Sequence, residues 1–140
     1  MDTHEITVSH QQNMVFEADI NGNRIVMDSP EDHLQSTGAS PKRLMLAALA
    51  GCTGVDVVSI LQKMKVPFSN LSIDIAATLT NEHPRIYKAV MVTYHITMAS
   101  DHQNKMEKAV TLSKEKYCGV MAMFAAFSQV TTQIMYTNKD

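Results

Sequence analysis

The sequence predicts an α+β fold in which antiparallel sheets surround one long, buried central helix. Segments rich in β-branched and aromatic residues stand before and after a single long apolar helix, without regular strand–helix–strand alternation. An Asn-Gly pair at positions 21–22, flanked by two strand-like segments, is a strong hairpin signal. The chain has 140 residues, which is enough for one domain with its own core. We therefore expect a single domain over residues 1–140.

The central helix is expected over residues 40–65, because its start and its end both carry ordinary helix signals. Ser40 is a good N-cap, and Pro41 suits the first helical position, where a missing N–H costs nothing. Lys63 favours the negative end of the helix dipole, and Pro67 ends the helix. Apolar residues nearly encircle the segment, and a helix of this kind is normally buried.

The other elements follow in order along the chain. Residues 14–20 and 24–27 form the two strands of the Asn-Gly hairpin, and residues 29–39 form a polar loop. Residues 71–79 and 85–98 are expected to pair as a long antiparallel hairpin. An amphipathic helix around Met106, a short apolar helix and a closing strand complete the chain, the last two over residues 121–127 and 129–137.

Composition and charge bear on the classes of partner. The net charge is −2 and no Lys/Arg run is present, which argues against a nucleic-acid surface. No secretory signal is evident, and Thr53, Asp56 and Ser59 argue against membrane insertion of the apolar helix. We expect a soluble, cytoplasmic protein without a membrane partner.

Two cysteines, Cys52 and Cys118, are candidates for redox chemistry. They lie far apart, outside any CxxC motif, and in a reducing cytoplasm such a pair is redox-active or incidental rather than a structural staple. The six histidines form no metal-ligand spacing, so neither a metal nor a cofactor is expected.

Cys52 belongs to a stripe of the central helix that changes from apolar to polar. Cys52, Asp56, Ser59 and Lys63 follow the spacing i, i+4, i+7, i+11, which places them on one face. The thiol would then stand at the mouth of a pocket. A small core hydrophobe remains the alternative interpretation, because free cysteines are often buried.

Cys118 is expected at the N-terminus of the last helix. Unpaired N–H groups and the positive end of the dipole lower the pKa of a thiol there. A thiol in the middle of a helix lacks this help. From local physics alone, Cys118 is predicted to be the better thiolate of the two.

Both cysteines lie in segments that resemble one known family. The stretch SPKRLMLAALAGCTGVDVVSILQKMK, with EKYCGV about fifty residues later, is similar to the OsmC/Ohr family, in its OsmC-like branch. The resemblance extends to NMVFEADINGNRIVMD and HPRIYKAVMVTYHITM, and so spans most of the chain.

The resemblance implies a tightly intertwined homodimer with its central helices packed back to back. It implies that Cys52 attacks the terminal oxygen of an organic hydroperoxide and becomes a sulfenic acid. Cys118 then condenses with it to a disulfide, which an external thiol reduces. This order of the cysteines is the reverse of the one that local physics predicts.

The sequence departs from the family at two charged positions. Active members have a glutamate just after the helix-start proline, where this chain has Lys42. They also have an arginine in the loop before the helix, where this chain carries Glu31, Asp32 and His33. Lys42 and Arg43 supply positive charge, but ~13–15 Å from Cys52 along the helix axis.

Three further residues complete the set of candidates for the pocket. Arg24 could reach the site only from a folded-back or partner strand. Asp56 lies one turn after Cys52 and is expected to pair with a neighbouring side chain. Tyr117 is expected to pack beside Cys118, with its hydroxyl at the pocket rim.

Three functions remain open at this point. The first is thiol-dependent reduction of organic hydroperoxides in stress defence through Cys52 and Cys118. The second is non-catalytic binding of a small hydrophobic ligand, or redox sensing, on the same dimer. The third is a purely structural role for two buried, unreactive thiols.

Overall fold

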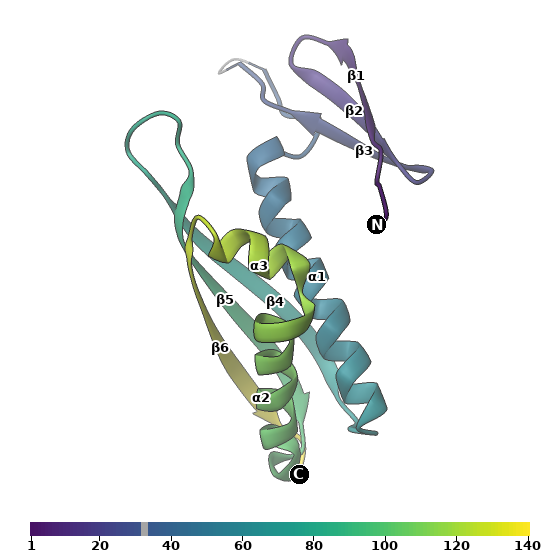
Figure 1. Cartoon of the computed structure of the whole chain (residues 1–140), viewed down its shortest axis with the longest axis vertical. Helices are drawn as coiled ribbons and strands as arrows, with labels where there is room; N and C mark the ends of the chain where they lie inside the picture. Colours follow the sequence, from purple (N-terminus) through teal and green to yellow (C-terminus); the bar gives the residue numbers. More distant parts are fainter. Residues whose placement is uncertain (32–33) are drawn as a thin grey trace. The chain divides into compact units, whose positions relative to one another are not determined.

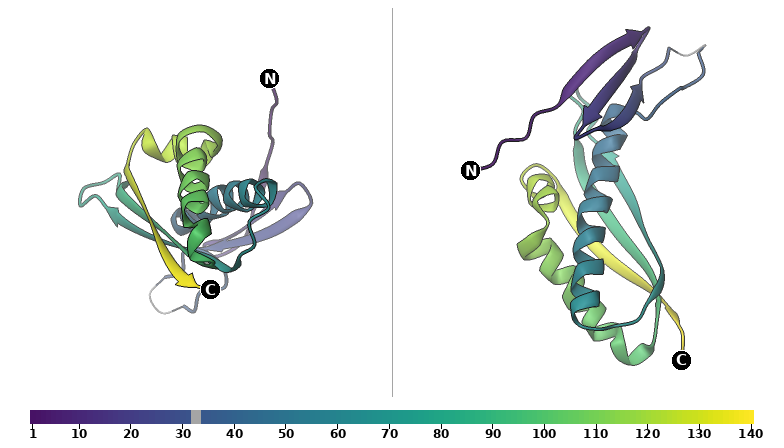
Figure 2. Two further views of the ribbon diagram at one scale, coloured as in Figure 1. Left: turned by 90° about the horizontal axis from the view of Figure 1, so that it is seen from below. Right: turned by 90° about the vertical axis from the view of Figure 1, so that its right-hand side faces the viewer.

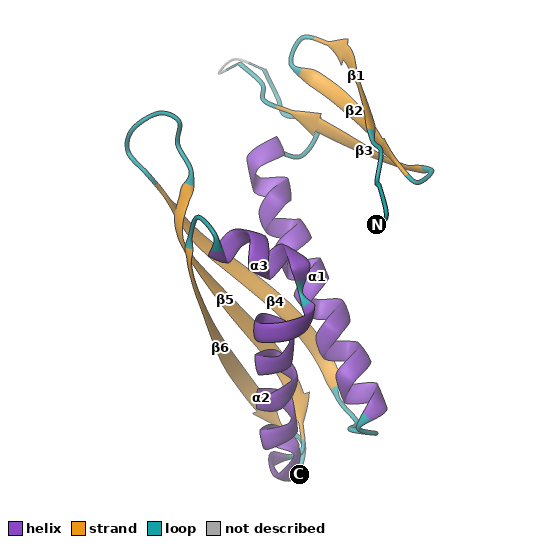
Figure 3. Cartoon of the chain, viewed as in Figure 1, coloured by secondary structure: helices purple, strands orange, loops and turns teal. Residues whose placement is uncertain are grey.

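The computed structural model describes residues 1–31 and 34–140. The chain forms two compact units, residues 1–46 and 47–140. Both units combine strands with helical segments, as Figures 1 and 3 show. The predicted α+β class is confirmed, and a single domain over residues 1–140 stays a prediction.

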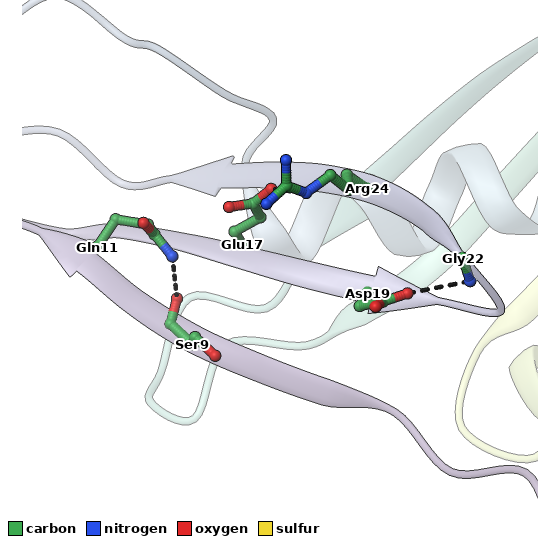
Figure 4. Close-up of polar contacts among 6 residues, drawn as sticks. All are labelled: Ser9, Gln11, Glu17, Asp19, Gly22 and Arg24. Carbon is green, nitrogen blue, oxygen red and sulfur yellow. Dashed lines mark hydrogen bonds and ion pairs between the residues drawn. The ribbon is translucent and has the colours of Figure 1, made fainter.

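The sheet of the first unit is an antiparallel meander. It consists of β1 (Thr7–Gln12), β2 (Val15–Ile20) and β3 (Asn23–Asp28), in that order. Asn21 and Gly22 connect β2 to β3 with φ angles of 42° and 87°, the positive values that a tight type I′ turn requires. Asp19 Oδ1 accepts a hydrogen bond from the Gly22 N–H at 3.0 Å (Figure 4). The predicted hairpin is confirmed.

A buried carboxylate ties the loop after β3 back to the strand. Asp28 is buried, and its Oδ2 accepts hydrogen bonds from both the N–H and the Oγ1 of Thr37, each at 2.9 Å. The Ala39 N–H donates to the Val26 carbonyl at 3.0 Å. A Cβ on Gly38 would lie 2.6 Å from that carbonyl oxygen, so this close approach of two backbones requires glycine.

Helix α1 (Pro41–Lys63) begins and ends close to the predicted residues. The Arg43 N–H donates to Ser40 Oγ at 3.4 Å, which is the expected N-cap contact. At the other end, Lys65 has a φ of 57° and the Val66 N–H donates to the Leu61 carbonyl, so the chain leaves the helix before Pro67.

The sheet of the second unit contains β4 (Ser69–Leu79), β5 (Tyr87–Met98) and β6 (Gln129–Asn138), in that order. Strands β4 and β5 pair antiparallel, as predicted. Strands β5 and β6 pair in parallel, so the prediction of purely antiparallel sheets was wrong.

The parallel pair follows from the connection between β5 and β6. This connection holds the 3₁₀ turn η1 (Ser100–His102), helix α2 (Gln103–Leu112), the π-helical turn η2 (Ser113–Tyr117) and helix α3 (Gly119–Ala125). A crossover of this length returns the chain to the end of the sheet where β5 started, which a hairpin cannot do. The two helices together act as one crossover between neighbouring strands.

One face of the second sheet carries the core of this unit. Helices α1, α2 and α3 all lie over this face (Figures 1 and 2). Alternate residues of β5 point into it, and the helices add one buried stripe each. The largest buried side chains are those of Tyr94, Phe124, Leu49, Leu61, Ile96, Met98, Met106 and Met121.

Burial around the whole of α1 is not found within the chain. Its buried residues are Leu49, Thr53, Val57 and Leu61, a single stripe with a spacing of four. Val55, on another side of the helix, is 69% exposed. The apolar residues nearly encircle α1, but the described elements cover one stripe of it.

Candidate active site

Both cysteines belong to the second unit, on two different elements. Cys52 lies in the middle of α1 and is half-buried, and Cys118 is 3% exposed. Cys118 is the N-cap of α3, and its Sγ accepts a hydrogen bond from the Met121 N–H at 3.2 Å. The predicted position of Cys118 at a helix N-terminus is confirmed.

The fold brings the two thiols together. The two thiols are near enough to interact, since the neighbouring Cys52 thiol is one of the causes that raise the pKa of Cys118. α1 supplies one sulfur, and the turn between η2 and α3 supplies the other. Two cysteines must lie near each other before they can form a disulfide, and this arrangement meets that requirement.

The predicted low pKa of Cys118 was wrong. Burial, as the largest cause, and the neighbouring Cys52 thiol raise the pKa of the Cys118 thiol from the ordinary value of 9.0 to about 11. The Met121 N–H does lower the pKa, as the helix-end argument expects, but burial outweighs it. The negative charge of Asp56 adds a further upward contribution. Cys118 is therefore a protonated thiol at neutral pH.

A chain of three hydroxyl groups and one carboxylate lies beside the thiols. Tyr94 OH and Thr53 Oγ1 are 2.7 Å apart, and Thr53 Oγ1 and Ser113 Oγ are also 2.7 Å apart. Ser113 Oγ then donates to Asp56 Oδ2 at 3.0 Å. All three hydroxyl-bearing residues are buried, so the bonds satisfy polar groups that would otherwise lack a partner.

This hydroxyl chain joins the three elements that surround the thiols. Thr53 and Asp56 come from α1, Tyr94 from β5, and Ser113 from η2. The Cys118 N–H also donates to the Ser113 carbonyl at 2.8 Å. Burial raises the pKa of Tyr94, which keeps its hydroxyl protonated. The chain therefore holds the segments of both cysteines in one arrangement.

Of the four members of the hydroxyl chain, only Asp56 was among the site residues predicted from the sequence. Thr53 had a signal that could have been used, because it is the polar member of the buried stripe Leu49, Thr53, Val57 and Leu61. A buried threonine in such a stripe requires a hydrogen-bond partner. Tyr94 and Ser113 had no comparable signal, since their contacts depend on the packing of distant segments.

Asp56 also borders a hollow of about 380 Å³ on the surface of the second unit. The hollow is lined by polar and apolar side chains together, namely Asp56, Ser59, Ile60, Lys63, Met64, Leu112 and Tyr117. Tyr117 is 52% exposed, and the Nζ of Lys116 lies 5.3 Å from the centre of its ring. Tyr117 thus stands at the rim of a hollow beside Asp56, and the thiols themselves are not among the lining residues.

The positively charged candidates belong to the first unit. Arg24 forms an ion pair with Glu17 on the neighbouring strand, with 2.7 Å between Nε and Oε1; Figure 4 shows the two side chains together. Lys42 and Arg43 are exposed in the first turn of α1. His33 lies outside the described residues. Among the described residues that act on the Cys118 thiol, no cation is found.

Comparison with known proteins identifies the family. The family model described as OsmC-like protein matches residues 33–133. Protein YhfA of Escherichia coli K12 is 30% identical over 110 residues, which cover 79% of this chain and 80% of the relative.

Solved structures agree in fold. A hypothetical protein from Aquifex aeolicus VF5 superposes with a TM-score of 0.87 at 24% identity, over 100% of both chains. An organic hydroperoxide resistance protein OsmC from Legionella pneumophila superposes with a TM-score of 0.67 at 17% identity, over 96% of this chain and 97% of that one. The chain belongs to the OsmC-like family.

Proposed function

We propose that this protein reduces organic hydroperoxides with a pair of cysteines, in which Cys52 attacks the peroxide and Cys118 resolves the product. The observation that carries the proposal is that the fold brings two cysteines from distant parts of the sequence near enough for their thiols to interact. Similarity to an organic hydroperoxide resistance protein agrees with this chemistry.

The proposed steps balance as follows. The Cys52 thiolate attacks the terminal peroxide oxygen, an S–O bond forms, the O–O bond breaks, and the alkoxide takes a proton to leave as an alcohol. Cys118 then attacks the sulfur of the Cys52 sulfenic acid, and the departing hydroxide takes the thiol proton to leave as water. Two external thiol groups then reduce the disulfide to two thiols through a mixed disulfide, and are themselves oxidised to a disulfide. The raised pKa of Cys118 supports this order, because the protonated thiol is the weaker nucleophile at neutral pH.

We further propose that the protein acts as a homodimer in the cytoplasm, where thiol reductants are abundant. The exposed side of α1 offers a surface against which a second copy of the chain can pack. It carries Gly51 and Val55, and with Leu71 and Ile73 of β4 it borders an open groove of about 590 Å³. A small residue beside an apolar one allows close approach of another helix.

Peroxide consumption tests the enzymatic proposal. Reduced protein is mixed with cumene hydroperoxide or with hydrogen peroxide, and thiols are counted before and after. We expect fast loss of two thiols per chain with preference for the organic peroxide. Cys52→Ser should abolish consumption, and Cys118→Ser should stop the reaction at the sulfenic acid. Undiminished consumption by Cys52→Ser would contradict the assignment.

Light scattering tests the homodimer separately. We expect the mass of two chains for the wild-type protein and of one chain for Val55→Lys. Thr111→Lys, at an exposed position on α2, is the matched control and should leave the mass unchanged. A wild-type mass of one chain would contradict the proposal.

The hollow beside Asp56 favours a second candidate, namely binding of a small, largely apolar ligand without turnover. Its lining includes the apolar side chains of Ile60, Met64 and Leu112. Here we expect an upward shift of the thermal unfolding temperature with medium-chain fatty acids, which Ile60→Lys removes. Wild-type protein that neither consumes peroxide nor shifts with these ligands would exclude both candidates.

A further inference from the structure

The π-helical turn η2 begins at Ser113 and leads directly into Cys118. The Cys118 N–H donates to the Ser113 carbonyl at 2.8 Å, which is the i to i+5 bond that defines a π-helical turn. The turn between α2 and α3 lies beside the middle of α1, as Figure 1 shows. The position of Cys118 therefore depends on where Ser113 is held.

The side chain of Ser113 is bound to α1 at two points. Its Oγ is 2.7 Å from Thr53 Oγ1, and it donates to Asp56 Oδ2 at 3.0 Å. Thr53 is the residue directly after Cys52. Thr53 and Ser113 are both fully buried, so water does not compete for the bond between their hydroxyls. This bond connects the backbone beside one cysteine to the turn that ends at the other.

The hydroxyl of Thr53 is used between elements. A threonine inside a helix commonly bonds to a carbonyl one turn back in its own helix. The partners of Thr53 Oγ1 are instead Tyr94 OH and Ser113 Oγ. Each hydroxyl has one proton to donate. Ser113 gives its proton to Asp56, so it accepts from Thr53, and Thr53 in turn accepts from Tyr94 on β5. The hydroxyl protons thus all serve to join α1, β5 and η2.

We propose that Thr53 and Ser113 are positioning residues for the resolving step: the bond between their hydroxyls fixes η2 on α1 and so holds the Cys118 sulfur within reach of the other thiol. This inference rests on the proposed function, in which Cys118 condenses with oxidised Cys52. Two sulfurs that are held close before they react lose little freedom when they join. Without the bond, η2 is free to move relative to α1, and formation of the disulfide becomes less favourable.

The thiol–disulfide equilibrium with glutathione tests the inference in the full-length protein without peroxide. Oxidised glutathione converts the two thiols to the Cys52–Cys118 disulfide and is itself reduced to two molecules of glutathione. Acid quenching and site-resolved mass spectrometry give the equilibrium constant. Thr53→Val keeps nearly the same shape and removes the hydroxyl, and the constant should fall by about three- to tenfold, the scale of one net hydrogen bond. Ser113→Ala, which removes the other hydroxyl, should give a fall of at least this size.

Three further variants separate positioning from general packing. Thr53→Ser keeps the hydroxyl and should restore a constant near that of the wild type. Thr93→Val is the matched control on β5, where it removes the 2.8 Å bond that Gln133 Nε2 donates to Thr93 Oγ1, and it should leave the constant unchanged. In Thr53→Val combined with Ser113→Ala, the constant should equal that of Ser113→Ala alone, because both changes break the same bond.

Circular dichroism shows whether each variant is folded, and either folded variant, Thr53→Val or Ser113→Ala, is sufficient for the test. Should both be unfolded, Tyr94→Phe takes their place. This variant removes the donor to Thr53 and should lower the constant by a smaller factor. The inference is overturned if the folded variants keep the wild-type constant, if Thr93→Val lowers it equally, or if the wild type forms no disulfide between its two cysteines.

Trapping of sulfenic acid with dimedone after one equivalent of cumene hydroperoxide gives a second measure. Because resolution should be slowed, we expect several-fold more label on Cys52 in Thr53→Val than in the wild type, and the wild-type amount in Thr53→Ser. The two proposals fail in different ways. A wild-type protein that forms the disulfide with glutathione but consumes no peroxide would sink the proposed function alone. Full peroxidase activity with unchanged constants in Thr53→Val and Ser113→Ala would sink this inference alone.

Discussion

The two three-stranded sheets of this protein are built in opposite ways. The sheet of the first unit is a meander whose strands are neighbours in sequence, joined by short turns. Every residue of β1 is exposed, and the buried residues among those described in this unit are Val15, Ala18 and Asp28. The sheet of the second unit contains a parallel pair closed by a long helical crossover, and alternate residues of β5 are buried throughout.

This difference separates local from long-range determinants of structure. Turn residues and strand-like segments define the first sheet, and little buried surface stabilises it. The second sheet depends on helices that cover one of its faces. The hydroxyl chain joins α1 and η2 to β5 of this sheet, and Cys118 is buried in the same unit. Both cysteines thus belong to the unit that has the larger core, where buried groups can be held in one geometry.

The largest effect is expected from a cavity in the second unit. Leu61 is fully buried on α1. Leu61→Ala should lower the free energy of unfolding by about 2–5 kcal/mol, because it loses buried surface and leaves a void. Urea unfolding at fixed protein concentration measures the change. Val8→Ala, at an exposed position of β1, is the control in the other sheet and should change little. Equal losses in the two variants would erase the contrast between the sheets.

A smaller effect is expected at alkaline pH, and it should arise from the second unit. The pKa of Cys118 is about 11 in the folded chain, compared with 9.0 ordinarily. Between these values the unfolded chain releases the proton first, so stability falls as pH rises from about 9 to about 11. In Cys118→Ala this part of the loss should be absent.

The tyrosines provide the internal reference for that titration. Burial raises the pKa of Tyr94, and it raises the pKa of Tyr136 to about 12, so both contribute a loss in the same direction. Both tyrosines are present in the wild type and in Cys118→Ala. The difference between the two profiles of stability against pH therefore reports the titration of Cys118. Parallel profiles from pH 9 to 11 would contradict the raised pKa of Cys118.

In the first unit, substitution in the turn between β2 and β3 should change the free energy of unfolding more than loss of the surface ion pair. Gly22 has a φ of 87°, which residues with a Cβ adopt at a cost. Gly22→Ala should therefore destabilise the protein by about 1 kcal/mol, although nothing lies within 4 Å of the added Cβ. Hydrogen exchange of the β2 and β3 amides measures the effect locally. Gly51→Ala, inside α1, is the matched glycine replacement, and its effect on the free energy of unfolding should have the opposite sign. An alanine in a helix interior should be neutral or stabilising, provided that Gly51 is not packed against a second copy.

The smallest effect is expected from the surface ion pair of the first sheet. Arg24 is 79% exposed in its ion pair with Glu17. Exposed pairs of this kind contribute about 0.2–1 kcal/mol and weaken with salt. A double-mutant cycle of Arg24→Ala and Glu17→Ala at low and high salt measures the coupling. A coupling as large as the effect of Leu61→Ala would show that the first sheet has a stronger stabilising element than its burial indicates.

Sequence reasoning succeeded where one segment decides the outcome. Ser40 caps α1, Asn21 and Gly22 turn the first hairpin, and Cys118 caps α3, all as expected from neighbouring residues. It failed where two distant segments decide the outcome. The parallel pairing of β6 with β5 was missed, because a crossover of two helices is not visible as regular alternation.

The sequence by itself determined the class of fold, the ends of the long helix, the two cysteines and, through their motifs, the family. These depend on propensities and turn geometry, which act over a few residues. Only the tertiary structure decided the protonation of Cys118 and the chain from Tyr94 to Asp56. Burial and hydrogen bonding depend on which distant groups pack together, and at Cys118 burial outweighs the local effect of the helix end.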